Sequence, residues 1–164
     1  MPSPLKSTLK HTEMQFTNAE LLPRVVSLLK EGHTVTLPLR GFSMRPFLED
    51  RRDKALLTYA NPDSLHKGMA VLAEIIPSHY VLHRIVDINA DMIILRGDGN
   101  IGTEQCRRKD VKAIAVGFYR KGRTQLDRTD GLKWRVYSVL WVHLFPVRRY
   151  LLWVYRLGRK LKKF

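Results

Sequence analysis

The sequence predicts a mainly β, α+β fold: a twisted antiparallel sheet or partly closed barrel, with one helix before it and amphipathic helices after it. Three observations lead to this prediction. Between residues 33 and 120, short runs rich in Val, Ile, Leu and Tyr are separated by Pro, Asn, Asp or Gly, as is typical of strands and turns. One helical pattern precedes these runs, and a basic, aromatic segment follows them.

The leading helix is expected from about Asn18 to Glu31. Thr17 or Asn18 can cap its first turn, and Gly32 stops it. Its apolar face, at helical spacing, comprises Leu21, Leu22, Val25, Leu28 and Leu29. Residues 1–15 are polar and lack an apolar run of signal-peptide length, so we expect a disordered tail and no secretory signal.

Six strands are expected in the middle of the chain. They correspond to "HTVTLPL", "KALLTY", "MAVLAEII", "YVLHRIVDI", "DMIILR" and "VKAIAVGFY". The "NAD" between the fourth and fifth runs indicates a tight hairpin turn. The expected organisation is a β domain with its leading helix at 16–122, a linker at 123–131, and a helical tail at 132–164.

The net charge of +14 is unevenly placed along the chain. Residues 1–106 hold 12 Lys and Arg against 12 Asp and Glu, whereas residues 107–164 hold 17 against 3. The second part therefore carries the whole excess, which anionic lipid, nucleic acid or an acidic partner could recognise.

The tail at 132–164 combines three tryptophans with many cations. Its apolar run Val136–Val147 is interrupted by His143 and Pro146, and is too short for a spanning helix, which needs about 20 apolar residues. The mixture favours a helix lying on an anionic membrane surface, split in two by Pro146. The alternative is a helical hairpin packed against the sheet. The interleaving of aromatic with aliphatic residues argues against a base-stacking groove and so disfavours nucleic-acid binding.

The single cysteine, Cys106, excludes an internal disulfide framework and makes a cysteine-based metal site improbable. It suits a reducing compartment, so we expect a cytoplasmic protein, peripheral to the inner face of the membrane. No cofactor or metal is expected, and the sequence leaves the oligomeric state open.

Three polar pieces lie in or beside the strand region: "GFSMRP" at 41–46, "LHRIV" at 82–86 and "RGDGN" at 96–100. They supply a hydroxyl, an imidazole and a carboxylate. A serine needs a base to become nucleophilic, and a histidine base benefits from an acidic group that fixes its tautomer. Each piece also has an ordinary interpretation, as a turn, a half-buried packing residue and another turn.

Taken together and in this order, the three pieces resemble the motifs of the signal peptidase superfamily of serine peptidases. The closest resemblance is to the endoplasmic-reticulum, archaeal and spore-former branch, which uses Ser–His rather than Ser–Lys. It runs from about Thr34 to Phe118, and "RKDVKAIAVGF" is similar to the strand that follows the Gly-Asp motif. The resemblance implies the twisted antiparallel β fold that this superfamily shares with self-cleaving repressors.

The resemblance also implies roles for individual residues. Ser43 would be the nucleophile and His83 the general base, with Asp98 and Glu104 as two candidates for the acid that orients it. The backbone N–H of Ser43 would be one oxyanion donor. Gly41 stands where the family often has a hydroxyl, so a second donor must be backbone or water. Gly41, Met44 and Pro46 would hold and surround the bend that exposes Ser43.

The implied function is a serine endopeptidase that cleaves an extended leader or signal-like peptide near the membrane surface. The chain departs from the family in having no recognisable membrane anchor. A self-cleaving repressor is disfavoured, because no Ala-Gly dipeptide occurs and only one helix precedes the first strand. The alternative function is a catalytically inactive module of the same fold, recruited to a membrane or partner by its basic tail.

Overall fold

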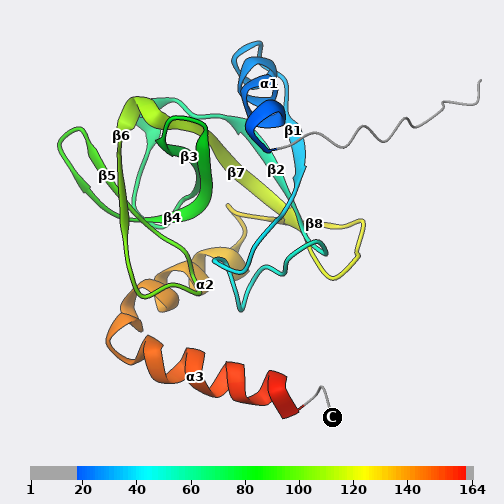
Figure 1. The fold of residues 1–164 in the computed structure, drawn as a ribbon, viewed down its shortest axis with the longest axis vertical. Helices are drawn as coiled ribbons and strands as arrows, with labels where there is room; N and C mark the ends of the chain where they lie inside the picture. Colours follow the sequence, from blue (N-terminus) through cyan, green and yellow to red (C-terminus); the bar gives the residue numbers. More distant parts are fainter. Residues whose placement is uncertain (1–17, 162–164) are drawn as a thin grey trace, which may run out of the picture.

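The computed structural model describes residues 18–161, so the tail expected at 1–15 lies outside the described residues. Within them the chain forms an antiparallel sheet of eight strands and three α-helices (Figure 1). The helices are α1 (Asn18–Lys30), α2 (Leu132–His143) and α3 (Phe145–Leu161). The strands are β1 (Val35–Pro38), β2 (Lys54–Tyr59), β3 (Ala70–Ile76), β4 (His79–Asn89), β5 (Met92–Arg96), β6 (Glu104–Arg107), β7 (Val111–Tyr119) and β8 (Leu126–Arg128).

The strand order is β1-β2-β7-β3-β4-β5-β6, with β8 pairing to β7. Every pair is antiparallel, as the mainly β, α+β prediction requires. The six expected runs correspond to β1 to β5 and β7. The expected hairpin is also confirmed, since β4 and β5 are joined through Ala90 and Asp91, with Asn89 paired to Met92.

Two strands, β6 and β8, are not expected from the sequence. Both are short and carry few apolar residues, so their own pattern does not identify them. The stretch expected to be a linker at 123–131 contains β8, whose Arg128 pairs with Gly117 of β7. A Cβ at Gly117 would lie 2.7 Å from the Leu126 side chain, so the glycine makes room for this extra strand.

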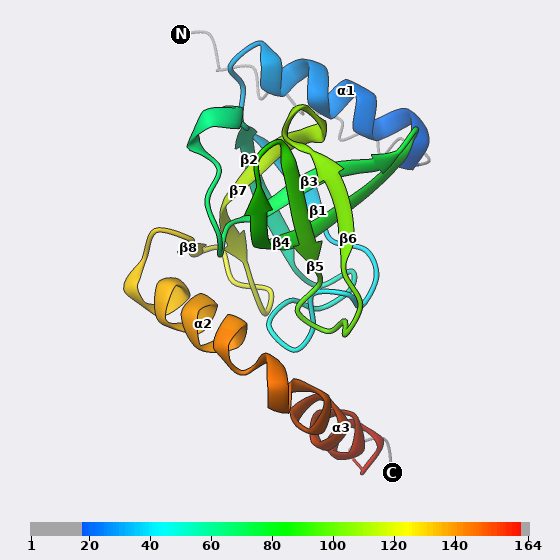
Figure 2. The same cartoon turned by 90° about the vertical axis from the view of Figure 1, so that its left-hand side faces the viewer.

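The helix expected at 18–31 is confirmed as α1, which lies across one end of the sheet domain, at the top of Figure 2. Leu22, Val25 and Leu29 of α1 are buried in a cluster with residues from β2, β3 and β7. Leu28, expected on the same apolar face, is 43% exposed instead. A second cluster lies between β3, β4, β5 and β6, and includes Ile85, Ile93 and Leu95.

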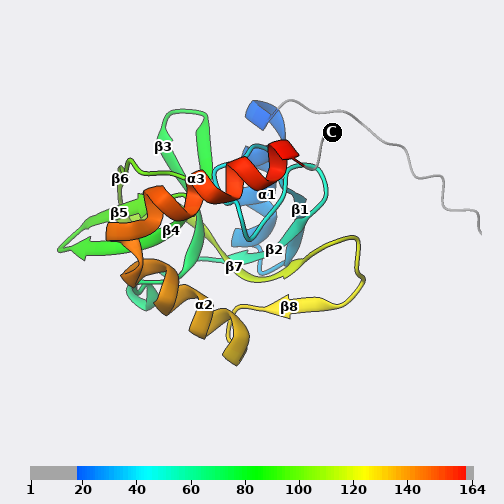
Figure 3. The same cartoon turned by 90° about the horizontal axis from the view of Figure 1, so that it is seen from below.

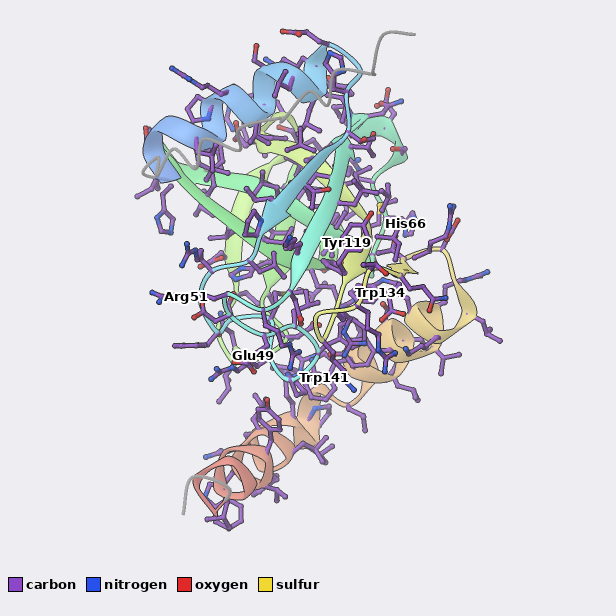
Figure 4. All side chains as sticks on the ribbon, turned by 90° about the vertical axis from the view of Figure 1, so that its right-hand side faces the viewer. Glu49, Arg51, His66, Tyr119, Trp134 and Trp141 are labelled. Atoms are coloured by element: carbon purple, nitrogen blue, oxygen red, sulfur yellow. The ribbon has the colours of Figure 1, made fainter. Side chains whose placement is uncertain are left out.

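Helix α2 packs on the sheet domain through aromatic side chains. Trp134 is 4% exposed, and its ring centroid lies 4.7 Å from that of Phe47 and 4.9 Å from that of Phe118. Tyr137 stacks on Phe47 at 4.4 Å. Figure 4 shows Trp134 and Trp141 on the side of α2 that faces the strands. This part of the tail therefore follows the alternative in which a helix packs against the sheet.

Pro146 falls in the first turn of α3, and the chain turns between α2 and α3, as expected from the sequence. Seen from below, α3 crosses the end of the sheet domain beside the loop of residues 39–53 (Figure 3). Arg52 of that loop lies near Tyr155 of α3. Among the described residues, no helix is long and apolar enough to cross a membrane.

Because Trp134 fills the contact between α2 and the sheet, we expect Trp134→Ala to lower the free energy of unfolding by about 3–5 kcal/mol. The matched control is Val139→Ala on the same helix, where the side chain is 58% exposed, and a change within about 0.5 kcal/mol is expected. Urea unfolding followed by fluorescence and circular dichroism measures both. Equal stabilities of the two variants would show that α2 is not part of the folded domain.

Candidate functional site

Ser43 lies in a tight loop between β1 and β2. Gly41 has a φ of +88°, a conformation that favours glycine, and its N–H donates to the Asp50 carboxylate at 2.7 Å. The N–H of Arg45 donates to the carbonyl of Phe42 at 3.2 Å, which closes a turn around Ser43. The loop therefore bends at the position that the sequence motif indicates.

Apolar residues that follow Ser43 anchor this loop. Met44, Phe47 and Leu48 are buried in the cluster beneath α1, and the Leu48 N–H donates to the Met44 carbonyl at 3.0 Å. Pro46, between them, is half-buried. Ser43 itself is half-buried, so the apolar residues that follow it are fixed in the core while its own side chain remains accessible.

The Gly97–Gly99 turn lies directly against the Ser43 loop. The Gly99 N–H donates to the Ser43 carbonyl at 2.7 Å. A Cβ at Gly97 would lie only 2.5 Å from that carbonyl oxygen and 3.0 Å from the Ser43 Cβ. A Cβ at Gly99 would lie 3.0 Å from the Phe42 carbonyl oxygen. The two glycines of "GDG" are therefore needed for close approach of two backbones, rather than for a turn alone.

Ser43, His83 and Glu104 line the same cavity, whose volume is about 290 Å³. Its other walls come from the loop before β2, from β4 and from the segment before β6. They comprise Leu39, Arg40, Gly41, Met44, Leu48, Glu49, Tyr80, Val81, Leu82 and Asn100. The structure thus brings together the serine, the histidine and one of the two candidate acids, with Gly41 and Met44 beside them. Pro46 is not among the lining residues.

Strand register places His83 and Glu104 on one face of the sheet. Leu95 of β5 pairs with Ile85 of β4 on one side and with Glu104 of β6 on the other. His83 lies two residues before Ile85, and alternate residues of a strand share a face. Accordingly, His83 Nδ1 and Glu104 Oε2 are 2.7 Å apart.

The contact between His83 and Glu104 is close but poorly aligned. Within residues 18–161, neither the His83 Nδ1 nor the Glu104 Oε2 has a partner that meets hydrogen-bond geometry. His83 is only 3% exposed. Burial lowers the pKa of His83 below its ordinary value of 6.5, although the charges of Glu104 and Asp98 act in the opposite direction. A lowered pKa favours the neutral imidazole, the state in which it can accept a proton.

Asp98 belongs to a different cluster. It is buried and accepts two hydrogen bonds of 2.8 Å from Arg84, one from Nε and one from Nη2. The Tyr137 hydroxyl also donates to its carboxylate at 3.1 Å, and Trp141 Nε1 donates to its backbone carbonyl at 3.0 Å. Of the two acids left open by the sequence, Glu104 is the one in contact with His83, and Asp98 instead pairs with Arg84.

Arg84 was not singled out from the sequence, although it is adjacent to His83. It is completely buried, and its Nη1 donates to the Gly68 carbonyl at 2.8 Å and to Ser138 Oγ at 2.6 Å. Its guanidinium carbon lies 4.8 Å from the Trp134 ring centroid. Strand alternation is the sequence feature that could have identified Arg84, because it directs His83 and Arg84 to opposite faces of β4.

The described residues contain no group of three His, Cys, Asp or Glu side chains placed to hold a metal ion. Comparisons of the chain with protein-family models, with curated proteins and with solved structures found no match.

Because a Cβ at Gly97 would collide with the Ser43 backbone, we expect Gly97→Ala to lower the free energy of unfolding by about 1–3 kcal/mol. It should also displace the Ser43 loop. Gly102→Ala is the matched control, since nothing lies within 4 Å of a Cβ there, and its effect should stay within about 0.5 kcal/mol. Chemical denaturation measures both variants, and a crystal structure of Gly97→Ala would show the loop. An unchanged loop and unchanged stability would contradict the expected role of this glycine.

Proposed function

We propose that the protein is a serine endopeptidase with the fold of the signal peptidase superfamily, in which Ser43 is the nucleophile and His83 the general base. The observation that carries the proposal is the cavity shared by Ser43, His83 and Glu104, with the His83–Glu104 contact of 2.7 Å inside it. The ordered sequence motifs supply Ser43 and His83, and Glu104 is one of the two candidate acids that the resemblance implies. The antiparallel sheet and the bend at Gly41 are features that such a site would need.

In this mechanism His83 takes the proton from Ser43 Oγ as that oxygen attacks the scissile carbonyl of the substrate. His83 then gives the proton to the leaving amine, and the C–N bond breaks to leave an acyl ester on Ser43. A water molecule, deprotonated by His83, hydrolyses the ester and regenerates Ser43. Glu104 orients the imidazole and stabilises its protonated form. Asp98 acts only through the electrostatic effect of its charge and by supporting the Gly97–Gly99 turn.

The Ser43 backbone N–H is the first oxyanion donor in this proposal. Gly41 has no side chain, so the second donor must be another backbone group or water. Asp98, placed beside Arg84, is a positioning residue and not a catalytic one.

The substrate would be an extended peptide that adds a strand along the cavity, with side chains read by shallow pockets. Leu39, Met44 and Leu82 give the cavity an apolar wall, which suits a leader or signal-like sequence. Helix α3, at the same end of the molecule, would hold the protein at the surface of an anionic membrane. We place the protein on the cytoplasmic face of the membrane, because its single cysteine, Cys106, suits a reducing compartment.

The serine and the histidine can each be tested by alanine substitution. Ser43→Ala and His83→Ala should each reduce peptide hydrolysis at least about 10³-fold, because the two groups act as a unit. A library of fluorogenic peptides provides the assay, and labelling by a fluorophosphonate should also disappear in Ser43→Ala. Ser64→Ala, a serine whose Oγ donates to the Asn61 carbonyl at 2.9 Å in an exposed turn, is the control. Undiminished hydrolysis by Ser43→Ala would refute the proposal.

The lowered pKa of His83 predicts a specific pH profile. A general base must be neutral, so kcat/KM should fall as pH decreases through a midpoint below 6.5 and should be level near pH 7. Glu104 raises the pKa of His83, so Glu104→Gln should move this midpoint to still lower pH while reducing the plateau rate. A pH series of kcat/KM on both proteins measures the two midpoints. A midpoint that rises in Glu104→Gln would contradict the assigned pairing.

One observation favours the second candidate, a catalytically inactive module. Among the described residues, no hydrogen bond joins Ser43 to His83, and the His83–Glu104 contact is misaligned. Catalytic hydrogen bonds are often loose before substrate binds, so the peptidase remains the preferred proposal. Inertness to serine-directed probes together with intact binding of an extended peptide would favour the module.

A further inference from the structure

Much of the exposed surface of α3 is apolar, whereas an ordinary surface helix turns its apolar side to the core. Arg148 and Leu152, one turn apart, face inward and are buried. The apolar residues exposed on α3 and at the end of α2 are each 37% or more exposed. They include Leu144, Val147, Tyr150, Leu151, Trp153, Val154 and Leu157. Contiguous apolar surface of this kind marks an interaction site, and the cations of the tail indicate an anionic partner.

A second observation lies where α2 meets α3. Arg148 is 2% exposed, and its Nη2 donates to the Trp141 carbonyl, while its Nε has no partner within the described part of the chain. Arg96, at the end of β5, likewise has a buried Nε without a partner there. Both guanidinium groups lie over the ring of Phe145, at 3.8 Å for Arg96 and 5.7 Å for Arg148.

This junction has more positive charge than its surroundings neutralise. Burial lowers the pKa of Arg148, and the charges of Arg96 and Arg84 lower it further, whereas Asp98 is the neighbouring anion that raises it. Asp98 is already engaged by Arg84 in a bidentate pair. Buried cations with free N–H groups are costly unless an anion completes their hydrogen bonds. The first turn of α3 adds the positive end of a helix dipole and has no acidic residue of its own.

We propose that Arg96, Arg148 and the first turn of α3 bind the phosphate of an anionic phospholipid. The acyl chains of the lipid lie along the exposed apolar side of α3. Phe145, which is 40% exposed, marks the edge at which the phosphate enters. A free phosphate would satisfy the arginines but not the apolar surface beside them, and the combination therefore points to a lipid. The inference extends the membrane-surface part of the proposed function and does not depend on peptidase chemistry.

The test measures binding of the full chain to vesicles of phosphatidylcholine, with and without phosphatidylglycerol. Wild type should bind only the anionic vesicles. Arg96→Gln and Arg148→Gln should each weaken binding about tenfold or more, as expected when a charged hydrogen-bond donor is lost. Arg149→Gln is the matched control, because Arg149 is the exposed neighbour of Arg148, and loss of one surface charge should weaken binding about fivefold.

Lysine variants distinguish a phosphate site with defined hydrogen-bond geometry from nonspecific electrostatic attraction to the membrane. Arg96→Lys and Arg148→Lys keep the charge but lose the planar fork, so they should bind almost as weakly as the glutamine variants. Equal binding by all the glutamine variants, Arg149→Gln included, would overturn the site in favour of a diffuse basic surface. Circular dichroism and thermal unfolding check each variant, and if Arg148→Gln is unfolded, the Arg96 and Arg149 pair decides the question.

Two further experiments identify the molecule that supplies the phosphate. Inorganic phosphate, tested at matched ionic strength, should compete only weakly with vesicles. Binding of inorganic phosphate without vesicle binding would assign the site to a free anion and overturn the lipid. Arginine-dependent binding of a single-stranded oligonucleotide that exceeds vesicle binding would do the same. Ser43→Ala should bind vesicles like wild type, so failure of the lipid site and failure of the peptidase proposal are distinguishable.

Discussion

The buried ion pair between Arg84 and Asp98 is the interaction on which the rest of the structure depends. A buried pair is tolerated only when its remaining donors and acceptors are also satisfied. Here the Gly68 carbonyl and Ser138 Oγ accept hydrogen bonds from the remaining donor of Arg84. Tyr137 and Trp141 donate hydrogen bonds to Asp98. Three of these four partners lie on α2. Helix α2 is therefore needed to complete the polar core of the sheet domain, and its aromatic residues cover the pair.

The same pair determines how the cavity is built. Strand β4 presents His83 to the cavity and Arg84 to the opposite face, because side chains alternate along a strand. Asp98 is drawn toward Arg84, and this fixes the Gly97–Gly99 turn, whose two glycines allow the Ser43 backbone to approach closely. The ion pair of Arg84 and Asp98, which does not line the cavity, thus positions the loop that carries Ser43. Glu104, on β6, remains free to contact His83.

The sequence was informative where the structure depends on local pattern. Strand periodicity predicts six strands, and Pro146 predicts the break between α2 and α3, because each rests on the conformational preference of nearby residues. Strands β6 and β8 escaped prediction because pairing to β5 and β7, rather than their own composition, makes them strands. The sequence also does not determine which of Asp98 and Glu104 contacts His83. That choice depends on a buried arginine that selects one acid through contacts across the fold.

Under the proposed peptidase function, the arrangement also bears on how the protein would meet a substrate at a membrane. The backbone of Trp141 accepts from Arg148 of α3, and its indole donates to Asp98, so a single residue joins the apolar helix to the support of the Ser43 loop. A catalytic domain on a flexible tether samples many orientations, whereas a helix joined through the core does not. If α3 lies on a membrane, the height and tilt of the cavity above it are set by the fold. Substrate selection would then include the distance of the scissile bond from the lipid surface, in addition to its side chains.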